Sequence, residues 1–124
     1  MNRTARHELA ERTFASRHVR PPSRWVRAST TSPLDLMLLR PDGDQLRATF
    51  VEIKTARGRR WSDLSDAESE FGRFAEDHGC PFVLARYRVV GRSVVSEHVF
   101  RPFASIAHER MDLGPRPREV EDAA

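Results

Sequence analysis

The sequence predicts an α/β domain with a central mixed β-sheet flanked by helices, in the order α-β-β-β-α-β-β. Two segments, 4–18 and 62–78, carry apolar residues at helical spacing, and strand-like apolar runs lie between and after them. A turn-forming run, Pro-Asp-Gly-Asp at 41–44, separates two of these runs. A chain of 124 residues holds one domain, which we place at residues 1–110.

The first helix is expected from Thr4 to His18, because Leu9, Ala10, Thr13 and Phe14 fall on one side. The two prolines at 21 and 22 end it and force an extended connection. Residues 24–28 then alternate charged residues with a tryptophan, which predicts an edge strand, and a polar loop follows at 29–32.

The remaining elements follow from the same periodicities. A hairpin is expected from strands at 34–39 and 47–55 around the 41–44 turn. The second helix is expected from Ser62 to His78, with Gly79 as its stop signal. Two strands, 82–89 and 93–100, complete the sheet, and the polar, proline-containing residues 111–124 predict a flexible tail.

Composition narrows the possible functions. The chain is 39% hydrophobic and 31% charged, and it has no apolar stretch long enough to span a membrane. Its first residues lack an apolar signal core, so we expect an intracellular protein. Its single cysteine excludes an internal disulfide and a thiolate-rich zinc site.

Positive charge is concentrated in the first half of the chain. Residues 1–60 hold 13 basic and 6 acidic groups, a net charge of +7, whereas residues 61–124 hold 8 basic and 12 acidic groups, a net charge of −4. A basic surface raises the affinity and encounter rate for nucleic acid. The other reading is a solvated arginine-rich face with no partner.

Lys54 is the only lysine of the chain and lies in an apolar, strand-like run, two residues after Glu52. Residues i and i+2 of a strand point to the same face. Unlike arginine, lysine has a pKa that falls readily on desolvation, which suits it to proton chemistry. Bias toward arginine codons explains the scarcity of lysine but not the position of this one.

Asp35 is the candidate partner of Glu52, because the two would lie on adjacent strands of the hairpin and converge on one ion. Mg²⁺ and Mn²⁺ prefer carboxylate oxygen, and the backbone carbonyl of Ile53 offers a third ligand. Lys54 would then orient a water, accept its proton or stabilise charge on a phosphate. The pattern is the Pro-(Asp/Glu)-x-Lys arrangement of nucleases; alone it also fits a surface ion pair with Asp35 as a chance neighbour.

Longer segments resemble the archaeal-type Holliday junction resolvases. They are Ala10-Glu11-Arg12, Trp25-Val26-Arg27-Ala28-Ser29, Leu34-Asp35-Leu36, Val51-Glu52-Ile53-Lys54 and the stretch 73–85. Together they cover most of residues 8–90, and the short motif cores are shared across the nuclease superfamily. The resemblance implies a restriction-endonuclease-like fold and Mg²⁺- or Mn²⁺-dependent cleavage of four-way DNA junctions by a homodimer.

By the same resemblance Glu11, Asp35, Glu52 and Lys54 take the catalytic positions, with Glu11 as a further metal ligand. Glu8, three residues earlier on much the same face, is the competing choice. Arg27, Ser29 and Thr30 match positions near the junction, although the family loop is richer in glycine. A solvated edge-strand arginine explains Arg27 equally well.

Other polar residues have plainer explanations. Arg57, Arg59 and Arg60 follow the lysine strand and would face a bound DNA backbone, or form a solvated loop. Glu68 fits a capping box begun by Ser65, which we favour over a role in the site. The five histidines show no metal-ligand spacing and are expected at the surface or at helix ends.

Three functions stay open: a junction resolvase, a restriction-like or repair nuclease acting on duplex DNA, and a non-catalytic DNA-binding relative. A four-way junction is two-fold symmetric, so a resolvase should be a two-fold dimer. Phe71, Phe74 and Trp61 are candidates for its contact; in a monomer they would be core residues.

Overall fold

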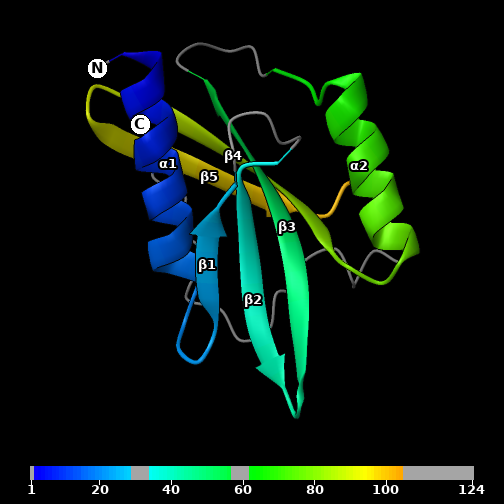
Figure 1. Ribbon diagram of the computed structural model, residues 1–124. Coiled ribbons are helices and arrows are strands. Elements are labelled where there is room, and N and C mark those ends of the chain that lie inside the picture. Colours follow the sequence, from blue (N-terminus) through cyan, green and yellow to red (C-terminus); the bar gives the residue numbers. More distant parts are fainter. Residues whose placement is uncertain (1, 29–33, 57–61, 105–124) are drawn as a thin grey trace.

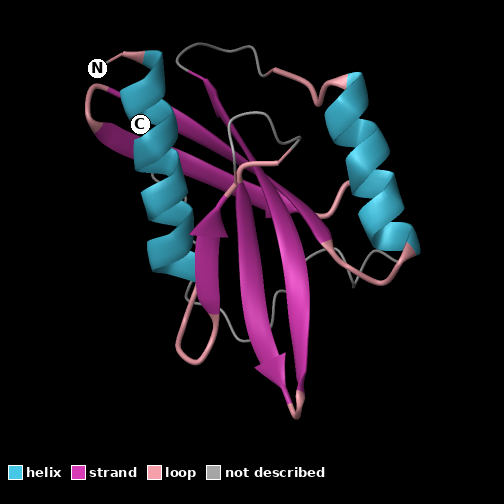
Figure 2. Ribbon diagram, in the orientation of Figure 1, coloured by secondary structure: helices cyan, strands magenta, loops and turns pink. Residues whose placement is uncertain are grey.

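The computed structural model describes residues 2–28, 34–56 and 62–104, which form a single five-stranded sheet with two helices (Figures 1 and 2). The observed element order is the predicted one, α-β-β-β-α-β-β. Residues 1, 29–33, 57–61 and 105–124 lie outside the described residues; most of the predicted polar loop and all of the predicted tail fall among them. The elements are α1 (Arg3–His18), β1 (Arg24–Arg27), β2 (Leu36–Asp42), β3 (Gln45–Ala56), α2 (Asp66–Asp77), β4 (Phe82–Val90) and β5 (Ser93–Phe100).

The sheet is mixed, as predicted. Its strands lie in the order β1-β2-β3-β4-β5, and β3 and β4 are parallel while the other neighbours are antiparallel. A parallel pair needs a crossover connection, and α2 is part of the segment that joins β3 to β4. The mixed sheet therefore follows from one helix inserted among antiparallel strands.

The two helices cover opposite faces of this sheet. Ala10 and Phe14 of α1 are fully buried in the core cluster that contains Val51 and Ile53 of β3. Phe71 of α2 instead packs edge-on against Phe50 of β3, with ring centroids 5.0 Å apart. Because successive strand residues point to opposite faces, Phe50 lies on the face away from Val51.

Helix α2 is shorter than expected, since it begins at Asp66 and not at Ser62. Ser65 is its N-cap: the Ser65 hydroxyl accepts a hydrogen bond from the Glu68 backbone N–H, and the Glu68 carboxylate accepts one from the Ser65 N–H. This capping box fixes the first turn of α2 at Asp66, so the residues before Ser65 are not part of the helix. Farther along, Gly72 packs so tightly that an added Cβ would stand 2.6 Å from the Phe103 ring.

The β2–β3 hairpin is longer than expected. Pairing continues past Pro41 to Asp42 opposite Gln45, so the turn is confined to Gly43 and Asp44. Gly43 adopts φ +63°, which glycine tolerates without strain, and an Asp42–Arg47 ion pair spans the end of the hairpin. No helix in the described parts of the chain is long and apolar enough to cross a membrane.

Candidate metal and catalytic centre

Asp35 is held at the end of the sheet, immediately before β2. Its backbone N–H donates to the carbonyl of Val51 at 3.0 Å, and its carbonyl accepts from the N–H of Ala28 at 2.8 Å. Its carboxylate Oδ2 accepts a hydrogen bond from the backbone N–H of Ile53 at 2.7 Å. The Asp35 carboxylate is therefore fixed against β3, which is the strand that carries Glu52.

Glu52 and Lys54 share one face of β3, as their spacing predicts. The Lys54 Nζ lies 3.6 Å from Glu52 Oε1, and the two side chains are only 17% and 6% exposed. Nζ also donates to both oxygens of Glu68 on α2, at 2.9 and 3.2 Å. The lysine is thus nearly buried between two carboxylates from different elements.

Burial and neighbouring charge separate the acids of this centre. Burial raises the pKa of Glu52 strongly, and the charge of Asp35 raises it further. Burial also opposes ionisation of Asp35, but hydrogen bonds from His7 and from the Ile53 N–H outweigh it and lower the pKa of Asp35. The two neighbouring acids are therefore shifted in opposite directions: ionisation is favoured at Asp35 and opposed at Glu52.

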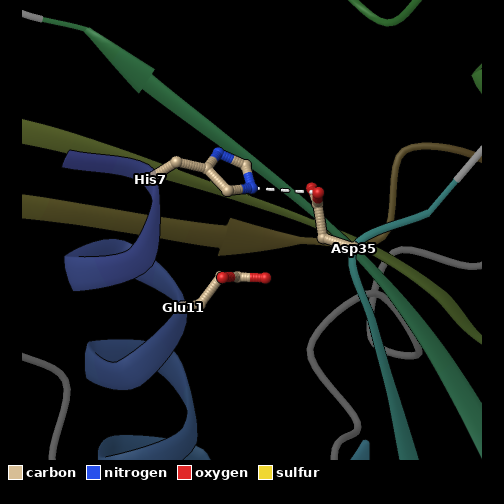
Figure 3. A group of neighbouring side chains, drawn as sticks. All are labelled: His7, Glu11 and Asp35. Carbon is tan, nitrogen blue, oxygen red and sulfur yellow. Dashed lines mark hydrogen bonds and ion pairs between the residues drawn. The ribbon is translucent and has the colours of Figure 1, made fainter. Parts of the chain in front are cut away.

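Helix α1 brings two more groups to Asp35 (Figure 3). The His7 Nε2 lies 2.9 Å from Asp35 Oδ1, and both side chains are part-buried. Glu11 lies one helical turn after His7 and is almost fully buried, with Oε1 3.2 Å from the guanidinium of Arg27. Burial raises the pKa of Glu11, against the opposing effect of Arg27.

Within the described residues, one group of potential ligands is compact enough to hold a single ion. The ligand atoms of His7, Glu11 and Asp35 all lie within 4.8 Å of one another. Glu11, and not Glu8, is therefore the α1 glutamate beside Asp35. Glu52 is not a member of this group, although its charge and that of Asp35 affect each other.

Two residues of the centre were not predicted. His7 lies in the first turns of α1 and is one-third exposed, but its contact with Asp35 and its place beside Glu11 as a possible ligand were not expected. The signal was its i, i+4 spacing to Glu11, which places both on one helix face. Glu68 forms the predicted cap, and its carboxylate also accepts hydrogen bonds from Lys54, a contact that the capping box did not predict.

The other predicted positions lie partly on β1 and α2 and partly outside the described residues. Arg27 is half-exposed and paired with Glu11. Phe71 packs inside the protein against Phe50 and Phe82, whereas Phe74 is 59% exposed. Outside the described residues lie Ser29, Thr30, Arg57, Arg59, Arg60 and Trp61.

A row of basic side chains leads away from Lys54 across the sheet. Lys54 is the register partner of Arg86 on β4, and Arg86 is the partner of His98 on β5, so all three lie on one face. Arg86 stacks over the Phe100 ring at 5.3 Å, and its buried Nε has no hydrogen-bond partner. His98 is exposed and stacked on Phe100. In this row, Lys54–Arg86–His98, the lysine is held by carboxylates, and Arg86 and His98 place further basic and aromatic groups beside it.

Comparisons of this chain with protein-family models, curated proteins and solved structures found no match.

Proposed function

We propose that this protein is a Mg²⁺- or Mn²⁺-dependent DNA endonuclease of the restriction-endonuclease-like fold. The observation that carries the proposal is the pairing of the part-buried Asp35 and the buried Glu52 with the single lysine of the chain, whose Nζ lies 3.6 Å from Glu52. A buried ionic cluster is costly for the fold, and perturbed acids of this kind concentrate at functional sites.

The acids of the centre fit a hard divalent cation. Burial, and after it the charge of Asp35, raises the pKa of Glu52, so its ionised form needs a stabilising cation that the neighbouring side chains do not fully supply. Asp35, Glu52 and the Ile53 carbonyl would hold the ion, while Glu11, the fourth predicted ligand, is grouped with His7 and Asp35 and not with Glu52. When bound, such an ion activates water and neutralises charge on the phosphate.

The protein side chains have separable tasks. The Ile53 N–H and His7 keep Asp35 in one orientation, so its charge is preorganised and needs no rearrangement on substrate binding. Glu68 fixes the ammonium of Lys54 next to Glu52. From there Lys54 orients the attacking water and supplies positive charge or a proton to the scissile phosphate.

DNA is the favoured substrate because the half of the chain that carries Glu11, Asp35, Glu52 and Lys54 has an excess of basic residues. The first sixty residues carry a net charge of +7, and the Lys54–Arg86–His98 row extends the basic surface over β4 and β5. Among DNA forms we favour four-way junctions, cut by a homodimer, because the resemblance to archaeal-type Holliday junction resolvases includes the Glu11, Asp35 and Glu52–Lys54 positions. Linear duplex DNA is the alternative substrate.

The test is incubation of the purified protein with labelled junction and matched duplex, with Mg²⁺ or with EDTA, followed by denaturing electrophoresis. Metal-dependent nicks in the junction, at least tenfold faster than in the duplex, are the expected result. Equal cutting of both substrates would favour the duplex nuclease. Cleavage that persists in EDTA, or the absence of any cleavage by a protein that binds DNA, would refute the proposed enzyme.

A further inference from the structure

The centre around Asp35 contains two sets of side chains from different elements, and Asp35 interacts with both sets. One set, Glu52 with Lys54, comes from β3. The other, His7 with Glu11, comes from α1 (Figure 3). The Oδ2 atom of Asp35 is engaged by β3 through the Ile53 N–H, whereas Oδ1 faces His7. Asp35 is therefore placed to act as a bridging carboxylate.

We infer that His7, Glu11 and Asp35 form a second divalent-metal subsite, separate from that of Glu52 and selective for Mn²⁺ over Mg²⁺. The inference rests on the proposed nuclease function and adds to it a nitrogen ligand and a second ion. Paired ions about 3.5–4 Å apart that share a carboxylate are a recurrent arrangement in phosphodiester hydrolysis.

Distances within the α1 set fit an octahedral ion. Ligands about 2.1 Å from such an ion lie about 3.0 Å apart when adjacent and about 4.2 Å apart when opposite. The His7 Nε2 and Asp35 Oδ1 atoms are 2.9 Å apart, which matches an adjacent pair. All three ligand atoms lie within 4.8 Å of one another, so an ion needs only small side-chain adjustments.

The surroundings of His7, Glu11 and Asp35 leave room for an ion to enter, and the carboxylates provide negative charge for it to neutralise. Glu11 is almost buried, and its cationic partner Arg27 is 53% exposed, so the guanidinium can leave without breaking the core. His7 is one-third exposed on the first turns of α1, which opens a path from solvent.

Selectivity follows from the donor set. Mg²⁺ binds carboxylate, carbonyl and water oxygen, and an imidazole adds little to its affinity, whereas transition ions gain from a nitrogen ligand. Replacing the imidazole should therefore weaken Mn²⁺ binding at this subsite at least tenfold, while Mg²⁺ binding changes less than about threefold.

The decisive experiment uses untagged protein loaded with Mn²⁺ and observed by pulsed electron paramagnetic resonance, which detects a directly coordinated ¹⁴N nucleus. Calorimetry on the same samples gives the number of ions bound. His7→Gln is the test variant, because a glutamine still donates a hydrogen bond to Asp35 but has no imidazole nitrogen. His98→Gln, at an exposed histidine of β5, is the matched control.

The wild type and His98→Gln should show imidazole nitrogen coupling and two Mn²⁺ ions, whereas His7→Gln should lose the coupling and one ion. Thermal unfolding checks that each variant is folded. No nitrogen coupling in the wild type, or coupling unchanged in His7→Gln, would overturn the subsite and leave His7 as a hydrogen-bonding partner of Asp35. Nuclease activity is scored separately: Mg²⁺-dependent cleavage without nitrogen coupling refutes only the subsite, and nitrogen coupling without cleavage refutes only the nuclease.

Discussion

Replacing Glu52 by glutamine should make the metal-free protein more stable while it abolishes cleavage. Burial and the neighbouring charge of Asp35 raise the pKa of Glu52 to about 10. The ordinary value in an unfolded chain is about 4.3. Folding therefore takes up a proton at every pH between these values, and stability falls as the pH rises through that window. The amide in Glu52→Gln occupies nearly the same space and has no charge to desolvate.

The gain in stability of Glu52→Gln follows from the difference between the pH and the pKa of Glu52 in the unfolded chain. Each pH unit above about 4.3 costs about 1.4 kcal/mol, so the penalty at pH 7 reaches an upper limit of roughly 3–4 kcal/mol. Lys54, 3.6 Å away, and local relaxation offset part of it, which leaves about 2 kcal/mol. For a domain of this size that corresponds to a rise in Tm of roughly 6–10 °C.

Thermal unfolding in EDTA at pH 5 and pH 7, for the wild type, Glu52→Gln and Glu70→Gln, measures this effect. Glu70 is an exposed glutamate on α2, so its variant controls for the loss of one negative charge. The advantage of Glu52→Gln should be larger at pH 7 than at pH 5, and excess Mg²⁺ should reduce it by stabilising the wild type alone. Equal or lower stability of Glu52→Gln at pH 7 would refute the cost of ionising the buried Glu52 on which the proposed metal site rests.

Three further predictions concern the lysine, the basic row and the opposite end of α1. Lys54→Ala should lose cleavage but keep DNA affinity within several-fold. Lys54→Arg should also cleave poorly, because a guanidinium is bulkier and does not release its proton. Gel assays measure cleavage, and fluorescence anisotropy in Ca²⁺ measures DNA binding. Arg86→Ala should weaken DNA binding and lower the slope of log affinity against log salt by about one, whereas the same change at Arg92, an exposed residue in the β4–β5 turn, should have a smaller effect. Glu97 is buried, and hydrogen bonds from His18 and Tyr87 lower its pKa despite burial. The ionised carboxylate therefore contributes to the free energy of unfolding above about pH 4.3, the ordinary pKa in an unfolded chain. This contribution is lost as the pH falls through the pKa of Glu97 in the folded protein. Glu97→Gln should therefore cost about 1–3 kcal/mol at pH 7 and flatten the acid limb of the stability curve, as urea unfolding from pH 3 to 7 would show.

The order of elements could be predicted because each one carries its own periodicity. Ala10 and Phe14 mark the buried side of α1, and the alternation along β3 separates Ile53 from Glu52 and Lys54. Element ends were less predictable, since they depend on local contacts. The Ser65 capping box delayed the start of α2, and ladder pairing carried the hairpin past Pro41.

The residues of the centre that lie on or next to the β2–β3 hairpin could be predicted from strand geometry. Glu52 and Lys54 share a face because they are two residues apart, and Asp35 joins them because hairpin strands are neighbours. His7 lies 28 residues before Asp35, and their contact depends on how α1 packs on the sheet. Glu68 was assigned to its cap alone because sequence spacing reveals the nearby partner, Ser65, and hides Lys54, which is 14 residues away.

Asp35 explains why these contacts converge on one point. It precedes β2, and its backbone is tied to Val51 and Ala28, which fixes the residue between α1 and β3. Its side chain then reaches the Ile53 N–H on one side and His7 on the other. Hydrogen bonds from His7 and the Ile53 N–H outweigh the cost of burial at Asp35, so its ionised carboxylate stabilises the fold. No such compensation outweighs burial at Glu11 and Glu52, so the pKa of each is raised. Two buried acids next to an ionised carboxylate are the arrangement expected for the proposed metal site.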